Sequence, residues 1–458
     1  MLWTVYDNEP DLFNQVAAFI ASNEDLDRIT ENEESALRVT SNNGRFDVVR
    51  LLLDAGAHEY QLEWTQTVHK VVFGSLDDIR AAIFKYNNID EPDFWSRTPL
   101  LIAILLGDID KVSLLLELGA NRHTVGRCGK TPLTYAIQKN NLPMLKWLIA
   151  QGFDIEQRDD FLYTPLISAA ELGMPDCVQT LIDCGADIHK VNHVADSAMR
   201  VATNMAVVRL LVRYGEDINN ISTEMRAELL GIECDGYPDV SKEVYLAGKY
   251  RRFGNCNAEL TDNSFWLSMI KSGASAWRAS EKYFDSGSVA GQPVWCYQRY
   301  GRSTTVMEDG RIIEIGGQHE DFYDPDFCIY NDVTVFGPDS SIRLYSYPKN
   351  DFPPTDSHTA TLVGNFIYII GNLGYTASRQ PNHTPVYKLN IDTFEIKKVK
   401  TTGDMPGWIS RHKATLIDKT IIIAGGKIIV DIDDKEDYIA NTSRYRLDLK
   451  NFRWQCLD

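Results

Sequence analysis

Apolar positions follow a helical spacing in the N-terminal half of this chain and a strand spacing from about residue 291 onward. In the first region, short apolar segments come in pairs, and one of them contains Val112, Leu114, Leu115, Leu116 and Leu118. A single pair of helices cannot bury that much apolar surface, so the pattern predicts a stack of neighbouring pairs. The last third instead shows short runs of β-branched residues between turns, which predict strands.

A short phrase opens successive helical pairs at a fixed interval. Thr-Pro-Leu occurs at 98–100, 131–133 and 164–166, and Ser-Ala-Met at 197–199 opens a fourth unit; each start lies 33 residues after the last (131−98, 164−131 and 197−164). The threonine suits a helix N-cap, and proline fixes φ at the first helical position. Gly119, Gly152 and Gly185 keep step, as expected for the left-handed residue that ends each second helix.

These motifs resemble the ankyrin repeat family, whose unit is a β-turn followed by two antiparallel helices. The resemblance implies an α-solenoid of six or seven units over residues 1–225. Residues 35–57 fit a complete unit, and 65–90 fit a poorer one without Thr-Pro. Residues 1–33 are acidic and predict helices over 12–20 and 26–29 that cap the stack. Gly119 follows Gly56 by 63 residues, and Gly215 follows Gly185 by 30, so some units are expected to be shortened.

Residues 226–290 follow neither repeat. The segment 264–284 carries Phe265, Trp266, Trp277 and Phe284 and predicts one or two helices interrupted at Gly273. Aromatic residues at helical spacing belong to a core more often than to a ligand site. We therefore expect this segment to join and pack the two halves.

Three stretches near the C-terminus share a pattern of two short strands that ends in a glycine, at Gly316, Gly371 and Gly425. Two further strands follow each of them, and Asp309-Gly310 is a typical hairpin turn. This arrangement resembles the kelch repeat of β-propellers. The resemblance places a histidine before the first strand; His358 and His412 match, whereas Ser303 takes that place in the first unit.

The predicted fold is therefore multidomain, α plus β: an ankyrin α-solenoid (1–225), a linker (226–290) and an incomplete or irregular kelch-like β-propeller (291–458). Three units are fewer than closed propellers need, so exposed strand edges are expected. Either the segment 226–300 covers them, or a second copy of the chain does so in a homodimer.

Composition narrows the class of protein. The formal charge of −18 argues against a broad nucleic-acid-binding face, and no apolar run is long enough to span a membrane. Eight scattered cysteines without a Cys-x-x-Cys pair favour reduced thiols and a cytoplasmic location. Residues 1–225 hold 33 acidic and 19 basic residues, a balance of −14, so this half carries most of the acidity. Such a surface either serves solubility or attracts a basic partner.

The ankyrin resemblance implies a protein partner, held by loop residues before each Thr-Pro-Leu and by residues near the end of each first helix. Carried onto this chain, these positions are Phe94, Trp95, Arg97, Leu105, Leu106, Arg127, Lys130, Gln138, Lys139, Asp160, Phe161, Tyr163, Glu171, Leu172, His193 and Asp196. Aromatic residues at loop tips are typical of binding hot spots. The competing interpretation is that Trp95 and Phe161 cover the adjacent helices.

An alternative surface is an acidic rim on the last propeller unit, expected in a long loop and formed by Asp431, Asp433, Asp434, Glu436 and Asp437. Its spacing lacks the central glycine of an EF-hand calcium loop, so we expect no metal there. No nucleophile elbow, phosphate-binding loop or zinc motif is present, so we expect neither a cofactor nor catalysis. The sequence therefore favours a non-enzymatic binding protein, for instance an inhibitor or immunity protein that blocks a basic toxin. A scaffold joining two proteins and an enzyme with a site on the propeller are the alternatives.

Overall fold

The structure is a computed structural model that describes residues 11–22, 25–31, 34–285, 292–319, 327–432 and 435–457. The chain divides into two compact bodies, an N-terminal body (Met1–Ser222) and a C-terminal body (Thr223–Asp458). The expected boundary at residue 225 falls inside helix α15 (Thr223–Leu230), which belongs to the C-terminal body. Residues 226–290, expected as a separate linker, belong to that body as well.

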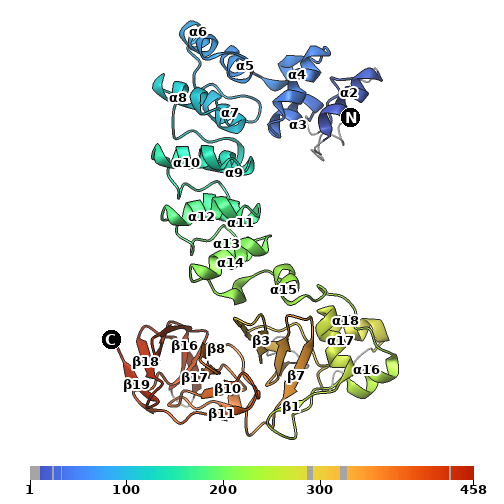
Figure 1. Cartoon of the computed structure of the whole chain (residues 1–458), viewed down its shortest axis with the longest axis vertical. Helices are drawn as coiled ribbons and strands as arrows, with labels where there is room; N and C mark the ends of the chain where they lie inside the picture. The colour runs from blue at the N-terminus through green and yellow to red at the C-terminus, as the bar shows by residue number, and fades with distance from the viewer. Residues whose placement is uncertain are drawn as a thin grey trace. The chain divides into compact units, whose positions relative to one another are not determined.

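Five helix pairs stack through the N-terminal body (Figure 1). They are α5 (Gln66–Phe73) with α6 (Leu76–Tyr86), α7 (Pro99–Leu106) with α8 (Ile109–Glu117), α9 (Pro132–Gln138) with α10 (Leu142–Ala150), α11 (Pro165–Glu171) with α12 (Pro175–Asp183), and α13 (Ala198–Val201) with α14 (Met205–Arg213). The predicted threonine caps form in two of the three Thr-Pro units, where the hydroxyl oxygens of Thr131 and Thr164 accept the amides of Thr134 and Ile167, whereas Thr98 makes no side-chain cap bond. The first helices pack in the order α5, α7, α9, α11, α13.

The two irregular intervals differ in their local structure. Asn87 ends α6 in the left-handed conformation, with φ of 51°, and so takes the place of the glycine that ends other second helices. Asparagine tolerates this conformation better than most residues. The interval of 30 residues arises because α13 is only four residues long.

The first helices of the chain lie beside the stack rather than at its end. Helices α2 (Leu12–Ala21), α3 (Ala36–Asn42) and α4 (Phe46–Asp54) precede the 3₁₀ turn η1 (Glu59–Leu62), and α3 packs on η1. The prediction of a helix over residues 26–29 is wrong, because these residues are not helical. Instead, Asp27 makes long-range hydrogen bonds, since its carboxylate accepts the backbone amide of His58 and the side-chain amide of Gln61.

The C-terminal body begins with α15, α16 (Lys242–Gly248), α17 (Ser264–Ser272) and α18 (Ala276–Tyr283). Helix α17 ends at Gly273, which has a φ of 61°, so the predicted break is confirmed. Phe265 and Trp266 are buried as expected, and the ring of Trp266 stacks on Trp295 at 5.2 Å. The prediction of a buried aromatic segment fails for Trp277 and Phe284, which are 62% and 90% exposed. Both lie outside the apolar face of α18.

Three antiparallel sheets of four main strands follow. The first sheet has the order β1 (Glu259–Leu260), β7 (Ile342–Ser346), β6 (Val333–Phe336), β3 (Ile312–Ile315) and β2 (Ser303–Val306). The second sheet comprises β11 (Ile396–Lys398), β10 (Val386–Asn390), β9 (Phe366–Ile370) and β8 (Thr359–Val363). The third sheet comprises β12 (Thr402–Gly403), β19 (Arg453–Cys456), β18 (Arg444–Asp448), β15 (Thr420–Ala424) and β14 (Lys413–Ile417). Strand β12 joins its edge in parallel.

Smaller elements complete the described residues. They are the pair β4 (Gln318–His319) and β5 (Cys328–Ile329), the sheet of β13 (Trp408–Ser410), β16 (Lys427–Ile432) and β17 (Lys435–Ala440), and the 3₁₀ turns η2 (Arg127–Gly129), η3 (Ile218–Asn220) and η4 (Thr376–Ser378). None of the helices in the described ranges is both long and apolar enough to cross a bilayer.

Apolar layers hold the C-terminal body together. One cluster joins the helices around Trp266 to the first sheet at Phe336. A second contains Ile313 of the first sheet and Ile367 of the second, and a third contains Ile370 of the second sheet and Leu447 of the third. Strand β1 from the helical segment also pairs with the outer strand β7. Residues 226–300 therefore cover one end of the sheet stack, which was one of the two expected solutions.

Candidate functional site

Four hairpin loops precede the first helices of the repeats and are called fingers below; they span residues 93–97, 126–130, 159–163 and 192–196. The residue near each tip has a positive φ: 59° at Ser96, 72° at Gly129, 63° at Leu162 and 66° at Ala195. These positions are again 33 residues apart, although only one of them is glycine. Since left-handed backbone is unfavourable for residues with a Cβ, other bonds must hold the fingers in shape.

Those bonds come from a carboxylate or amide at the base of three fingers. The Asp159 carboxylate accepts the amides of Phe161 at 2.9 Å and Tyr163 at 2.8 Å. Asp93 and Asn192 accept the corresponding amides of their own fingers. Each finger is thereby closed locally, by the turn chemistry for which Asp and Asn are suited.

Neighbouring fingers are also bonded to one another. The amides of Arg127, Asp160 and His193 donate to the carbonyl oxygens of Trp95, Cys128 and Phe161, at 3.3, 3.1 and 3.0 Å. The fingers thus form one continuous ribbon beside the first helices, which share one side of the stack in Figure 1. Residues that the sequence placed on separate loops therefore belong to a single surface.

Helix α3 covers the N-terminal part of this surface. The Trp95 indole nitrogen donates to the Arg38 carbonyl oxygen at 3.0 Å, and the Arg38 guanidinium lies 3.6 Å from the centre of the Phe94 ring. At the end of α3, the Lys139 ammonium donates to the Asn43 carbonyl oxygen. Burial lowers the pKa of Lys139. These residues contact the chain itself, so the covering interpretation holds for Trp95.

Two predicted contact residues are inaccessible, and these predictions are corrected. Arg97 is fully buried: its guanidinium pairs with Asp93 at 2.6 Å and donates to the Ser41 carbonyl and hydroxyl oxygens. Leu105 is only 5% exposed, and a Cβ added to Gly44 would lie 3.0 Å from its Cγ. A partner cannot reach either side chain while α3 is in place.

The C-terminal part of the surface is open. Phe161 is 47% exposed and lies 5.5 Å from the ring of His193, measured between centroids. Leu172 is 42% exposed at the end of α11, and the hydroxyl of Tyr163 donates to Glu171 at 3.1 Å. The other predicted residues in the accessible part are exposed or half-buried: Leu106, Arg127, Lys130, Gln138, Asp160 and Asp196. The structure thus leaves a mixed set of apolar and charged side chains accessible along the fingers and the ends of the first helices.

The expected acidic rim is not a loop. Asp431 of β16 pairs with Glu436 of β17 in a hairpin, and Asp437, which is exposed, pairs with Val430. Alternating apolar residues such as Ile428 and Val430 let this segment extend β13 as a sheet. Asp433 and Asp434 lie outside the described residues.

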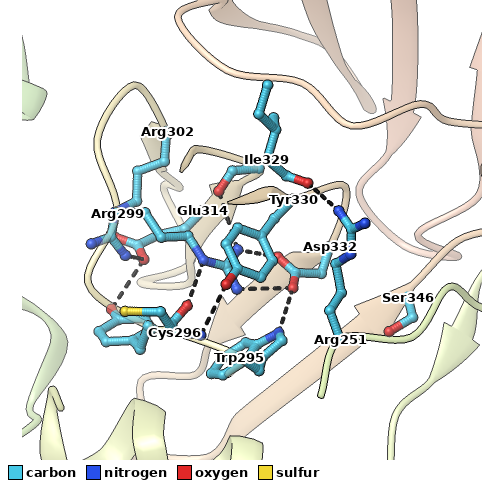
Figure 2. A network of polar contacts seen from close by, with 12 residues as sticks. Arg251, Trp295, Cys296, Arg299, Arg302, Glu314, Ile329, Tyr330, Asp332 and Ser346 are labelled. Atoms are coloured by element: carbon cyan, nitrogen blue, oxygen red, sulfur yellow. Dashed lines mark hydrogen bonds and ion pairs between the residues drawn. The ribbon is translucent and has the colours of Figure 1, made fainter. Parts of the chain in front are cut away.

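A buried polar network in the C-terminal body was not predicted (Figure 2). Asp332 pairs with Arg299 and accepts the Trp295 indole N–H at 3.1 Å, and the Arg299 guanidinium lies 3.4 Å from the centre of the Tyr330 ring. In the same way Glu314 pairs with Arg302 at 2.9 Å. These bonds fasten the segment before β2 to the first sheet.

Glu314 also pairs with Arg226 of α15 and accepts the hydroxyl of Tyr297 at 3.0 Å. Burial alone would raise the pKa of Glu314, but Arg226 and Arg302 outweigh it, so the pKa is lowered and the carboxylate stays charged. Because both buried carboxylates are neutralised by arginine, the network stabilises the fold rather than offering a free general acid or base. Its sequence signal was only the Arg-rich stretch 299–302.

Two buried histidines link successive sheets. His358 Nε2 bonds Ser303 Oγ at 2.8 Å, and His412 Nε2 bonds Thr359 Oγ1 at 2.9 Å. The expectation that Ser303 replaces the repeat histidine is wrong. Ser303 pairs with Ile315 as Thr359 pairs with Ile370, so Arg302 takes the histidine position, because the first hairpin has a longer loop.

Burial lowers the pKa of His358 to about 3, with a further contribution from His412, and that of His412 to about 4. Both rings are therefore neutral at physiological pH. Within the described ranges, no three His, Cys, Asp or Glu side chains come together as a metal site would require.

Comparison with known proteins supports the first half of this picture. A family model for ankyrin repeats, in three copies, matches residues 71–159 and 100–192. The putative ankyrin repeat protein R599 of Acanthamoeba polyphaga mimivirus is 24% identical over 172 residues, 38% of this chain and 45% of that protein. The N-terminal half therefore contains ankyrin repeats, as predicted.

One partial match gives weak support for the kelch resemblance. Kelch domain-containing protein 3 of Rattus norvegicus is 29% identical over 144 residues, 31% of this chain and 35% of that protein. Among solved structures, the ankyrin repeat domain of Bcl-3 is 26% identical with a TM-score of 0.31, covering 46% of this chain and 95% of that one. The chain spans less than half the length of either curated relative.

Proposed function

We propose that this chain is a non-enzymatic protein-binding protein and that its partner binds the open part of the finger surface. Ankyrin repeat proteins generally act as protein–protein interaction modules. The observation that carries the proposal is the exposure of Phe161 beside His193, on a ribbon whose backbone is fixed by hydrogen bonds. A rigid aromatic residue on such a framework loses little entropy when it binds.

Photo-crosslinking tests where the partner binds. A benzophenone amino acid in place of Phe161 should capture the partner, whereas the same probe in place of Phe84 should not. Phe84 is the matched control because it is also an exposed phenylalanine, 94% exposed on α6. Equal capture at both positions would contradict the proposal.

Once the partner is known, truncation measures the contribution of the ring. Phe161→Ala should cost on the order of 2 kcal/mol, a roughly 30-fold loss of affinity seen mainly as faster dissociation. Phe84→Ala should leave the dissociation rate unchanged within about twofold. Surface plasmon resonance gives both rates, and similar effects of the two changes would argue against a hot spot at Phe161.

The more specific proposal is an inhibitor, such as an immunity protein that blocks a basic toxin. It is supported by the acidity of residues 1–225, with 33 acidic against 19 basic residues. Raising salt from about 0.05 to 0.5 M should then slow association by about tenfold or more, because exposed charges are screened. If the association rate does not change with salt, the acidity of residues 1–225 serves solubility rather than binding.

We also propose that the three sheets are kelch-like units of an open propeller and that the chain acts in the cytoplasm. The second point is supported by the eight cysteines, none of which forms a disulfide within the described residues. A scaffold joining two proteins is the second candidate function, and it is favoured because both bodies carry exposed surfaces.

A homodimer through a sheet edge is tested by light scattering on the whole chain.

A further inference from the structure

The third sheet has two unlike faces. On one face Ile421, Ile423, Leu447 and Trp454 are buried in the cluster shared with the second sheet. Side chains alternate along a strand, so their neighbours point to the opposite face. That opposite face is called the basic face below, and its members are Lys413, Thr415, Ile417, Thr420, Ile422, Ala424, Arg444, Arg446, Asp448, Arg453 and Gln455.

Strand register places the charges of the basic face in rows. Lys413 pairs with Ala424, which pairs with Arg444 in turn. In the next row Ile422 stands beside Arg446, whose guanidinium donates to Gln455 at 2.5 Å. The third row ends in Asp448 and Arg453. Among the described residues, four cations therefore share one face with one carboxylate.

The equivalent face of the second sheet is a packing surface, so its residues show what a packing surface has at these positions. Its equivalent pair is Ile370 with Val386, both fully buried against the third sheet. In the third sheet the pair is Ala424 with Arg444, and Arg444 is exposed. A polar outer face keeps the terminal unit of a stack soluble. Solubility alone does not require an excess of positive charge, however, and this chain has 64 acidic and only 46 basic residues.

We propose that the basic face docks an extended acidic segment of a partner protein. Arg444 and Arg446 are two residues apart on one strand and both exposed, so their Cα atoms are spaced by about 6.8 Å along it. Carboxylates at alternate positions of an extended segment have the same spacing. Arginine presents a planar fork that matches a carboxylate, and Gln455 orients one of these forks.

Two other occupants are disfavoured. A second copy docking through the same face would oppose like charges across a two-fold axis. For a nucleic acid, the described residues of the face offer no aromatic side chain on which a base could stack, and the chain has a net charge of −18. The inference does not depend on the finger surface, which lies in the other body.

The test uses the full chain and a fluorescent peptide of alternating glutamate and threonine, followed by anisotropy at about 0.1 M salt, where the Debye length is about 10 Å and only local charges matter. The double variant Arg444→Glu and Arg446→Glu should weaken binding about tenfold or more. The matched control is Lys398→Glu with Lys400→Glu, an exposed pair with the same spacing and the same change in charge. It should change binding by less than about twofold.

Circular dichroism melts confirm that each variant folds, and Arg444→Gln with Arg446→Gln serves if the charge reversal does not fold. Three outcomes would overturn the inference: no binding by the wild-type chain, equal loss in the control variant, or tighter binding of an oligothymidine of matched charge. Self-association of the wild-type chain that the Arg444→Glu and Arg446→Glu variant abolishes would overturn it as well, in favour of a contact between copies.

Discussion

The buried ion pair of Arg97 and Asp93 shows how one residue can join two parts of a repeat protein. Asp93 closes its own finger by accepting two backbone amides, and Arg97 extends from that finger to the Ser41 carbonyl oxygen of α3. Both side chains are inaccessible to solvent, with 1% and 0% exposure. Neither charge could be left alone in this environment without a large loss of stability.

Replacing Arg97 tests this role. Arg97→Met should lower the free energy of unfolding by about 3–5 kcal/mol, because the Asp93 carboxylate stays buried without its partner. Arg127→Met, at an exposed position of the next finger, should change it by less than about 0.5 kcal/mol. Urea unfolding followed by circular dichroism compares the two variants. A small effect at Arg97 would show that α3 detaches readily from the finger.

Neutral buried histidines make the C-terminal body sensitive to acid. Burial lowers the pKa of His319 to about 3, with help from Arg299 and Arg251, and lowers those of His358 and His412 to about 3 and 4. Above pH 6.5 the rings are neutral in both the folded and the unfolded chain. Below it the unfolded chain binds protons that the folded chain refuses, so stability falls until the folded values are reached.

Each such histidine should lower the free energy of unfolding by about 1.4 kcal/mol for every unit that the pH falls between 6.5 and 4. Unfolding free energies from urea titrations at pH 7.5, 6.5 and 5.5 should therefore be flat over the first interval and fall over the second. The variant His358→Asn is expected to be less stable at pH 7.5 but to show a shallower fall. An unchanged slope in this variant would mean that its ring titrates in the folded state.

At the scale of the elements, the fingers have a regular shape at irregular sequence positions. Left-handed tips occupied by Ser96, Leu162 and Ala195 carry a steric cost that glycine would not. The hydrogen bonds between neighbouring fingers and those within each finger offset this cost. Such strain is retained only where the surrounding structure determines the conformation.

Ala195→Gly should accordingly raise the free energy of unfolding by about 0.5–1 kcal/mol, because glycine relieves a φ of 66°. The same substitution at Ala55 should lower it by a similar amount, since that residue has a φ of −82° at the end of a helix. Both residues are exposed, so packing changes little. Chemical unfolding of the two variants should give opposite signs, and equal signs would contradict the interpretation of the tip.

For the whole molecule, helix α15 decides where the chain can be divided. Arg226 of α15 pairs with Glu314 of the first sheet, so α15 belongs to the sheets although it follows the repeats in sequence. A cut after residue 222 should give two fragments that each unfold cooperatively. Residues 231–458 should be less stable than residues 223–458, because Glu314 loses one of its two arginines.

Calorimetry of the three fragments provides this measurement. Residues 1–222 should keep a helical circular dichroism spectrum and a single transition. If residues 223–458 and 231–458 melted at the same temperature, the pair between Arg226 and Glu314 would contribute nothing to the body.

The sequence alone determined the local elements. Thr-Pro pairs and glycines fix where repeat helices begin and end, and alternation of apolar residues fixes the strands, because both depend on neighbours along the chain. The break at Gly273 and the three sheets follow from such signals. The repeat positions before each Thr-Pro-Leu and near the end of each first helix likewise included exposed residues such as Phe161 and Leu172.

Only the tertiary structure decided which of these surfaces stay open. Nothing in the repeat interval shows that α3 lies over the fingers, so Arg97 and Leu105 read as contact residues although they are buried. The register of the first hairpin, which puts Arg302 where a histidine was expected, depends on the length of the loop between its two strands. The side chains of the basic face are exposed or half-buried, because the third sheet packs on the second through its other face. These features arise from contacts between distant segments, and the period of a sequence does not encode which distant segment covers a face.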